Sequence, residues 1–488
     1  MNKKYTSPNV LVILADEHRW DCLGACGNTA IMTPNIDALA NDGMVYTNCF
    51  ATFPVCTPSR YSFLTGLYVH QHLGWTNEST LPAGIKTFPR ILKDAGYKTA
   101  CVGKMHFMPT YANYGFDRMM LAEQAGPGRL DDDYHRYLKV RGLLDRVDLV
   151  DQVATFRARA TADYFANFGT DVSNLADEHY STTWIGDRAC EEIGSWDETC
   201  ANLLVAGFIK PHHPFDAPPP WSDMYDPEKL ELLPGWTEQI CQVDNAYGIG
   251  YFDFMRLTET SMKKILAQYY ASITQIDHHV GRMIDILKDK GLYDNTLVIY
   301  TSDHGDYMGF HHLVLKSNYM YDPVIKVPLV IKFPGSKPRG LNENLVSNID
   351  ITATIIDTAD CQIPQDRWHL VQPLDDESGR DVVFAEKDNG DYMVRTMNRK
   401  LLFSQKKRSQ FFDLDQDPLE NNDVLDDPRY ETDVERMKAL LFDWLAFSAR
   451  SQVHVDEKGP VIEGDNVPPR DDDHRDRMNA WFHAIMDL

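Results

Sequence analysis

A cysteine near the N-terminus lies where a helix would begin, one turn before a cation. Cys56 opens the stretch Cys-Thr-Pro-Ser-Arg, which ends at Arg60, and Leu-Thr-Gly follows at 64–66. Pro58 is typical of the first turn of a helix, where its missing N–H costs nothing. The partial positive charge of that helix end and the guanidinium both favour an anion. The sequence therefore predicts either a thiolate at position 56 or an oxyanionic substrate bound beside it.

Two pairs of potential metal ligands come directly after apolar, strand-like runs. Asp16 and Glu17 follow one such run, and Asp303 and His304 follow another. Because ligands bind beyond the carboxyl ends of strands in open parallel sheets, both pairs are expected to face one crevice. Carboxylate oxygens together with an imidazole nitrogen suit a divalent cation.

Three further motifs place basic side chains after predicted strands. They are Gly-Lys-Met-His at 103–106, Pro-His-His-Pro-Phe at 211–215, and the isolated Lys316. The chain carries a net charge of −24, so cations that handle an anionic substrate must be concentrated locally. This makes Lys104, His106, His212 and Lys316 candidates for the same site, with Asn77 added as a possible pocket residue.

Together these motifs resemble the signature of the type I sulfatases, in the alkaline-phosphatase-like superfamily, over roughly residues 8–420. The resemblance implies a sulfuric ester hydrolase in which a maturation enzyme oxidises Cys56 to formylglycine (3-oxoalanine). It also implies a divalent metal, usually calcium, bound by Asp16, Glu17, Cys56, Asp303 and His304. Glu17 stands where a second Asp or Gln is usual and His304 where Asn is common. The nitrogen donor keeps manganese or zinc open.

The resemblance further implies roles for the basic residues. Arg60 would hold the hydrated aldehyde, and Lys104 and Lys316 would neutralise the sulfuryl group. His212, which the family motif selects over His213, would protonate the leaving alcohol. His106 would take the proton whose loss releases sulfate. The expected substrate-binding residues are Asn77, Lys104, His212 and Lys316, and the expected catalytic residues are Cys56, Arg60, Lys104, His106, His212 and Lys316.

Composition restricts the partners and the compartment. The excess of 72 acidic over 48 basic residues argues against nucleic acid and against anionic membranes. Nine cysteines without paired spacing do not describe a disulfide framework. The apolar run after Lys3 and Lys4 is too short for a signal peptide, and no stretch approaches the length of a membrane span. We therefore expect a cytoplasmic protein.

Strands that alternate with helices indicate an α/β fold: a doubly wound, mostly parallel sheet flanked by helices. The resemblance to the sulfatases implies that this fold is alkaline-phosphatase-like. The pattern predicts strands at 9–14, 98–102, 203–209, 296–301 and 328–333, and helices at 34–43, 88–95, 266–288 and 349–359. These would form a catalytic domain over 1–378, with an insertion at about 124–198 that covers the site.

The pattern changes after about Gly379. Residues 379–455 are expected to form a smaller α+β domain, with short antiparallel strands at 382–385, 392–397 and 401–404, a turn-rich stretch at 412–415 and a helix at 434–447. Residues 456–488 are expected to be a linker and a terminal amphipathic helix. That helix would dock on the protein itself or on a partner subunit, so a homo-oligomer is possible.

Three other functions remain open from the sequence. A phosphonate monoester hydrolase or phosphodiesterase of the same superfamily would also use formylglycine. A binding protein could keep the fold without catalysis, and a cysteine hydrolase could use the thiolate itself. The substrate is expected to be a small sulfate monoester, such as a sulfated sugar, choline sulfate or an aryl sulfate.

Overall fold

The computed structural model describes residues 7–123, 132–143, 162–196, 199–240, 244, 252–316, 319–335, 340–375, 377–388 and 390–448. Its main sheet has nine strands: β1 (Asn9–Asp16), β2 (Met44–Phe50), β3 (Lys98–Gly103), β4 (Arg118–Leu121), β5 (Asn202–Pro211), β6 (Thr296–Ser302), β7 (Lys326–Val327), β8 (Leu329–Lys332) and β9 (Gly340–Ser347). The strand order is β4-β3-β5-β1-β6-β8-β2-β7, and β9 pairs with β2.

Parallel pairing dominates this sheet. β1 runs parallel to β5 and β6, β3 to β4 and β5, and β2 to β9. Antiparallel pairs join β8 to β6 and to β2, and β7 to β2. Every residue of β1 is buried, as expected for a strand covered on both faces. The predicted doubly wound, mostly parallel sheet is therefore confirmed.

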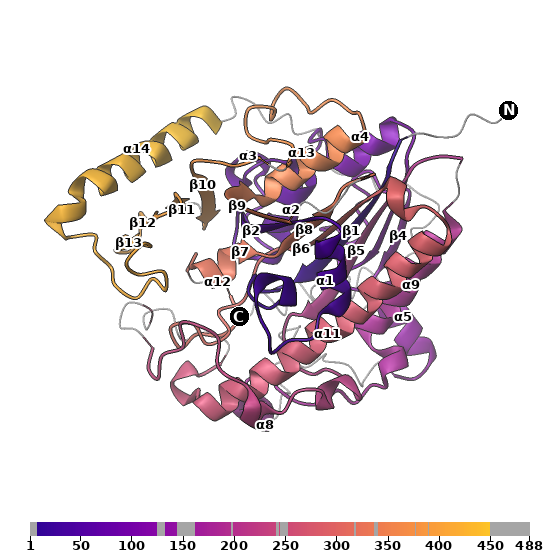
Figure 1. Cartoon of the computed structure of the whole chain (residues 1–488), viewed down its shortest axis with the longest axis horizontal. Coiled ribbons are helices and arrows are strands. Elements are labelled where there is room, and N and C mark those ends of the chain that lie inside the picture. The colour runs from indigo at the N-terminus through magenta and orange to yellow at the C-terminus, as the bar shows by residue number, and fades with distance from the viewer. Residues whose placement is uncertain are drawn as a thin grey trace.

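Helices cover both faces of the sheet. Their bounds are α1 (Pro34–Asn41), α2 (Cys56–Thr65), α3 (Val69–His72), α4 (Phe88–Asp94), α5 (Asp133–Val140), α8 (Ala162–Ala166), α9 (Ser181–Ser195), α11 (Glu259–Asp289), α12 (Asp322–Ile325), α13 (Asn348–Thr358) and α14 (Glu431–Ser448). In Figure 1, α9 and α11 run side by side along one face, and α2, α4 and α13 lie on the other side of the strands. Two apolar cores, one on each face, result from this arrangement.

Several elements differ from the sequence-based expectation. β2, β4 and β9 were not predicted. α11 begins at Glu259 rather than Leu266, because Thr258 and Ser261 form a capping box there. β5 continues to Pro211 instead of ending before it. Within the expected insertion, α9 packs against α11 and β5, so this helix belongs to the helix layer. Much of the rest of the insertion lies outside the described residues, and its covering of the site stays a prediction.

A smaller C-terminal domain carries the second sheet. Its four antiparallel strands are β10 (Val383–Lys387), β11 (Asp391–Arg395), β12 (Arg399–Ser404) and β13 (Gln410–Asp413). β13 is a correction, since this stretch was expected to be turn-rich. α14 covers the sheet (Figure 1), with the Trp444 ring stacked on Phe384 at 4.7 Å between centroids. The expected tail at 456–488 lies outside the described residues, and the exact domain boundaries stay predictions.

Candidate active site

The register of the sheet brings the ends of four strands together. Asp16 at the end of β1 pairs with Pro211 of β5, and Ala15 pairs with Ser302 of β6. Gly103 of β3 pairs with Gly207 of β5. The motifs that follow these strands therefore enter the same crevice, as the sequence predicted.

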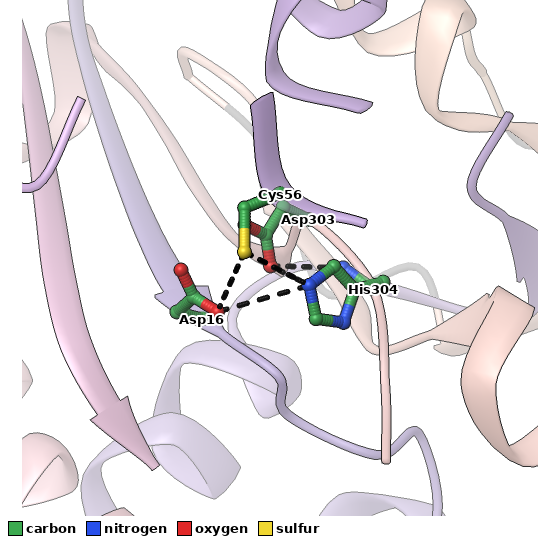
Figure 2. A group of neighbouring side chains, drawn as sticks. All are labelled: Asp16, Cys56, Asp303 and His304. Atoms are coloured by element: carbon green, nitrogen blue, oxygen red, sulfur yellow. Dashed lines mark hydrogen bonds and ion pairs between the residues drawn. The ribbon is translucent and has the colours of Figure 1, made fainter. Parts of the chain in front are cut away.

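Four side chains meet at this edge and point toward one another (Figure 2). Cys56, the first residue of α2, places its Sγ 3.3 Å from Nε2 of His304 and 3.6 Å from Oδ1 of Asp16. Nε2 of His304 is 3.8 Å from Oδ1 of Asp16 and 3.8 Å from Oδ1 of Asp303. All four residues are buried, and one ligand atom from each lies within 4.8 Å of the others.

Arg60 fixes the two carboxylates of this cluster. Its Nε donates to Oδ2 of Asp303 at 2.7 Å, and its Nη2 donates to Oδ2 of Asp16 at 3.1 Å. Its Nη1 donates to the carbonyl of Lys104 at 2.6 Å. Because the guanidinium takes the Oδ2 atom of each carboxylate, both Oδ1 atoms are left to face Cys56 and His304.

Two ammonium groups flank the sulfur. Lys104 makes a short ion pair with Asp16 and its Nζ is 3.8 Å from Sγ of Cys56. Lys316 places its Nζ 3.2 Å from the same sulfur and 3.2 Å from Oε2 of Glu17. Burial and Asp16 raise the pKa of the thiol, but Lys104, Lys316 and His304 outweigh them and lower it to about 6. Position 56 is therefore a site that stabilises an anion.

His212 and His106, from two of the basic motifs, are both buried near this centre. Nδ1 of His212 faces the carbonyl of His213 at 2.7 Å, so Nε2 is directed at Oε2 of Glu17, 3.4 Å away. Burial and Lys316 hold the pKa of His212 well below its usual range. Burial and Lys104 lower the pKa of His106 to about 3. Both rings are thus neutral near pH 7 and can exchange protons with a bound anion.

Glu17 lies in a second, adjoining group. Its carboxylate, His212 and His213 bring their ligand atoms within 4.8 Å of one another, apart from the four residues around Cys56. Its backbone has a φ of 66°, and the hydroxyl of Tyr269 donates to its carbonyl at 2.6 Å. Oε1 of Glu17 is buried without a hydrogen-bond partner in the described part of the chain.

Asn77 is placed beside the helix start and not against the sulfur. Its Oδ1 accepts a hydrogen bond from the N–H of Thr57 at 3.1 Å, which satisfies one of the free donors of α2. Sequence reasoning missed Glu123, which follows β4. Its Oε1 accepts from the N–H groups of Met105 and His106 at 3.1 and 3.0 Å and so holds the loop that carries Lys104. Only the prediction of β4 could have drawn attention to it.

The donor set fits a divalent cation. Nδ1 of His304 is 2.9 Å from the carbonyl of Gly305, which directs Nε2 toward the carboxylates. Burial lowers the pKa of this ring, but Asp303 and Cys56 outweigh it and raise the pKa to about 9, so a bound cation would take the place of the proton on Nε2. With both Oδ1 atoms directed inward by Arg60, the cluster offers two oxygens, one nitrogen and the atom at position 56. Oxygen ligands suit calcium, and the nitrogen also admits manganese or zinc.

Two known protein families match this chain. The family described as Sulfatase matches residues 8–361, which is most of the chain. The family described as N-sulphoglucosamine sulphohydrolase, C-terminal, matches residues 309–445. The first match covers every residue of the cluster, and the second covers the C-terminal sheet.

Individual relatives are similar over most of their length. An arylsulfatase of Clostridium perfringens is 29% identical over 464 residues, covering 89% of this chain and 93% of the relative. A choline-sulfatase of Rhizobium meliloti is 27% identical over 481 residues, covering 91% and 88%. The solved phosphonate monoester hydrolase of Agrobacterium radiobacter superposes with a TM-score of 0.75 at 25% identity, covering 93% of this chain and 99% of that one.

Proposed function

This chain belongs to the sulfatase family and is a sulfuric ester hydrolase, and we propose that it cleaves sulfate monoesters of small organic molecules at the cluster around Cys56. The observation that carries this proposal is the meeting of Asp16, Cys56, Asp303 and His304 between two buried ammonium groups. Cleavage of a sulfate ester spreads negative charge over the sulfuryl oxygens, and cations held in place stabilise that charge.

We propose that Cys56 is converted to formylglycine by a maturation enzyme and that Asp16, Asp303, His304 and residue 56 hold a divalent cation, with Glu17 beside them. Calcium is the first candidate, and manganese and zinc are the alternatives that the imidazole allows. When formed, the hydrated aldehyde would supply an oxygen nucleophile, and a bound cation would lower the pKa of its hydroxyl group.

The chain's own residues position the ester. Arg60 keeps the two carboxylates and the carbonyl of Lys104 in one arrangement, so residue 56 faces a fixed centre. Lys104 and Lys316, both within 4 Å of the sulfur of Cys56, would pair with the sulfuryl oxygens. The half-buried Asn77 lies beside the first turn of α2 and would line the pocket.

The two histidines would move the protons. When an anionic ester approaches Lys316, its charge offsets the ammonium that disfavours protonation of His212. His212 can then carry a proton on Nε2 and give it to the leaving alkoxide. His106 stays neutral beside Lys104 and would accept the proton whose loss frees the sulfate.

A phosphonate monoester hydrolase is the second candidate, because a solved enzyme of that kind superposes with a TM-score of 0.75. Phosphonate monoesters are also anionic and would meet the same two cations. The Gly-Lys-Met-His motif at 103–106, which resembles the sulfatase element, favours sulfate. Rates on an aryl sulfate and on an aryl phosphonate, measured with one preparation, separate the two activities.

The proposed substrates are small sulfate monoesters. Sulfated sugars, choline sulfate and aryl sulfates are the candidates, and the named relatives act on esters of the last two kinds.

Eight cysteines of the described chain are free, which is consistent with a reducing cytoplasm. No helix of the described chain is long and apolar enough to cross a membrane. We keep the expectation of no nucleic-acid partner and of a possible homo-oligomer.

The proposal is tested by comparing converted and unconverted protein. Mass spectrometry of the peptide that contains residue 56 reports whether the side chain has lost the elements of hydrogen sulfide and gained an oxygen. We expect sulfate release from an aryl sulfate only in the converted form, its loss with a chelator, and its return with calcium or manganese. Full activity of the unconverted thiol form would instead support the cysteine hydrolase.

A further inference from the structure

A cavity of about 580 Å³ lies between the loop that follows β1 and the C-terminal domain. Its wall includes Trp20 from that loop, the segment 231–234, Lys326 of β7 and Arg395 of β11. None of the four residues around Cys56, and neither Lys104 nor Lys316, lines it. The catalytic proposal therefore leaves this cavity unused.

Lys326 is the unusual residue of the wall. Its side chain is only 8% exposed, and its Nζ lies 3.6 Å from the centroid of the Trp20 ring. The other two cations of the described wall are paired: Nε of Arg19 with Asp21 at 2.7 Å, and Nη2 of Arg395 with Asp322 at 3.1 Å. Lys326 has no ion pair with any acid that the structure describes. Asp322 and Asp21 also line the cavity and act on Lys326 from a longer distance, but each is already paired with an arginine. An anion supplied from outside would therefore add to the stabilisation of this buried ammonium.

The rest of the wall limits what the anion can be. It is apolar and aromatic over much of its area, with Leu232, Leu233, Tyr270, Phe310 and Leu419 among its residues. Three acids, Asp21, Glu231 and Asp322, also line the cavity and would repel a ligand of high negative charge. The volume is within the range of cavities that hold small organic ligands, about 300–1,000 Å³.

We propose that this cavity binds a monoanionic organic molecule with a flat apolar ring, its acid group on Lys326 and its ring against the apolar wall. An aryl carboxylate, aryl sulfonate or aryl sulfate has this chemistry. The cavity is thus a second ligand site of the chain, separate from the catalytic cluster and independent of the reaction performed there.

The test is a calorimetric titration of the metal-loaded, converted enzyme with 2-naphthalenesulfonate, which cannot be hydrolysed as an ester. Inorganic sulfate is kept in excess to occupy the catalytic site. We expect binding of one equivalent, weakened by about tenfold or more in Lys326→Met because the ion pair is lost. Leu232→Trp keeps the charge but fills the cavity, and it should abolish binding.

Lys104→Met is the matched control, since it removes a buried ammonium from the catalytic cluster and not from this cavity. It should leave the affinity for 2-naphthalenesulfonate unchanged. Binding that survives both Lys326→Met and Leu232→Trp, that disappears in Lys104→Met, or that is absent from the wild-type enzyme would overturn the proposal. Thermal denaturation confirms that each variant is folded. If Lys326→Met is not folded, the binding measured for Leu232→Trp alone decides the test.

Discussion

Arg60 shows how single side chains make the buried cluster possible. Asp16 and Asp303 are both fully buried and would repel each other without compensation. Burial opposes ionisation, yet Lys104 and Lys316 hold the pKa of Asp16 well below its usual range. Burial and Asp16 instead raise the pKa of Asp303, and the guanidinium between the carboxylates offsets only part of this rise. The charges of the site are thus balanced residue by residue, which keeps its geometry fixed.

The role of His212 is tested by how much its substitution lowers kcat for esters with different leaving groups. In His212→Gln, kcat for a sulfate ester of an alkyl alcohol should fall by about 100-fold or more, because a poor leaving group needs a proton. For 4-nitrophenyl sulfate, whose leaving group is stable as an anion, the loss should be much smaller. Steady-state kinetics on the two esters measure this difference.

His213→Gln provides the control for that experiment. Nδ1 of His213 is 3.9 Å from Glu17, near the same carboxylate, but the ring has no proposed role in proton transfer. The His213→Gln substitution should change kcat for the two esters to the same degree. Equal losses for the two esters in His212→Gln would count against general acid catalysis by this residue.

The cations around Cys56 predict an early ionisation of its thiol. In unconverted protein treated with a chelator, the ultraviolet absorbance of the thiolate should rise with a midpoint near pH 6, because the lowered pKa places the thiolate above that pH. Burial raises the pKa of Cys22, Cys49 and Cys101, so these thiols do not contribute there.

Cys56→Ser removes the absorbance step and identifies its source. Since the folded pKa is below the unfolded one, the thiolate stabilises the fold at alkaline pH, and this contribution is lost as the pH falls through about 6. A titration midpoint near pH 9 would mean that the lysines do not act on the sulfur as the structure indicates.

At the scale of the elements, the end of β3 lies very close to β5 where the loop that carries Lys104 begins. Gly103 ends β3 with a φ of 85°, and the next N–H, that of Lys104, donates to the carbonyl of Gly207 at 2.7 Å. A Cβ at position 103 would collide with that carbonyl oxygen. Glycine is therefore required here by both the dihedral angle and the space, and Lys104 depends on it.

Gly103→Ala should lower the free energy of unfolding by about 2–4 kcal/mol, since it combines a left-handed dihedral angle with a steric clash. It should also reduce activity, because the clash displaces Lys104. Gly291→Ala is the matched control, with a φ of 68° and no atom within 4 Å of the added Cβ. Its expected cost is only about 1 kcal/mol.

Urea denaturation measures the free energy of unfolding of the two glycine variants, and steady-state kinetics measure their activity. A cost for Gly103→Ala no larger than that for Gly291→Ala would show that the strand ends can move apart. That result would remove the structural reason given for the position of Lys104.

On the scale of the whole molecule, one carboxylate joins the two domains. Asp322 on α12 pairs with Arg395 and with Lys400 of the C-terminal sheet, at 3.1 and 2.8 Å. Lys400 is fully buried and also pairs with Glu420 at 2.6 Å. Burial opposes the charge of Asp322, but Arg395 and Lys400 lower its pKa. The domains are therefore held by a buried charge network as well as by apolar contact.

Asp322→Asn should destabilise the protein by about 3 kcal/mol, because it leaves buried cations without their carboxylate. In the wild type, the contribution of Asp322 is present at neutral pH and is lost only below the usual range for aspartate, where the carboxylate takes up a proton. Asp415→Asn, which weakens an exposed pair with Arg399, should cost less than about 1 kcal/mol.

Chemical denaturation at several pH values checks this pair of variants. A difference between them that vanishes at neutral pH would show that the network does not hold the domains together. A difference that vanishes only in acid would agree with the ionised form of Asp322 being the one that stabilises.

Local sequence patterns determined much of this protein. Apolar runs predicted β1, β3, β5 and β6 within a few residues, because burial on both faces of a parallel sheet leaves a continuous apolar signal. Residues directly after those strands had to share one edge, so Asp16, Lys104, His212 and Asp303 could be grouped before the structure was known. β9 was missed because its residues Gly340–Ser347 are polar and partly exposed and carry no such signal.

Only the tertiary structure shows that the candidate ligands form two neighbouring groups, one around Cys56 and one around Glu17. The sequence predicted Glu17 among the metal ligands, and that role stays a prediction; in the structure its Oε2 lies 3.4 Å from Nε2 of His212 and 3.2 Å from Nζ of Lys316, in a group that adjoins the other four ligands. The cavity beside Lys326 likewise depends on Trp20 and the C-terminal domain meeting across the fold. Hydrophobic periodicity acts over a few residues and determines elements. The direction of a side chain is set by contacts with residues far away in the chain, which no local pattern records.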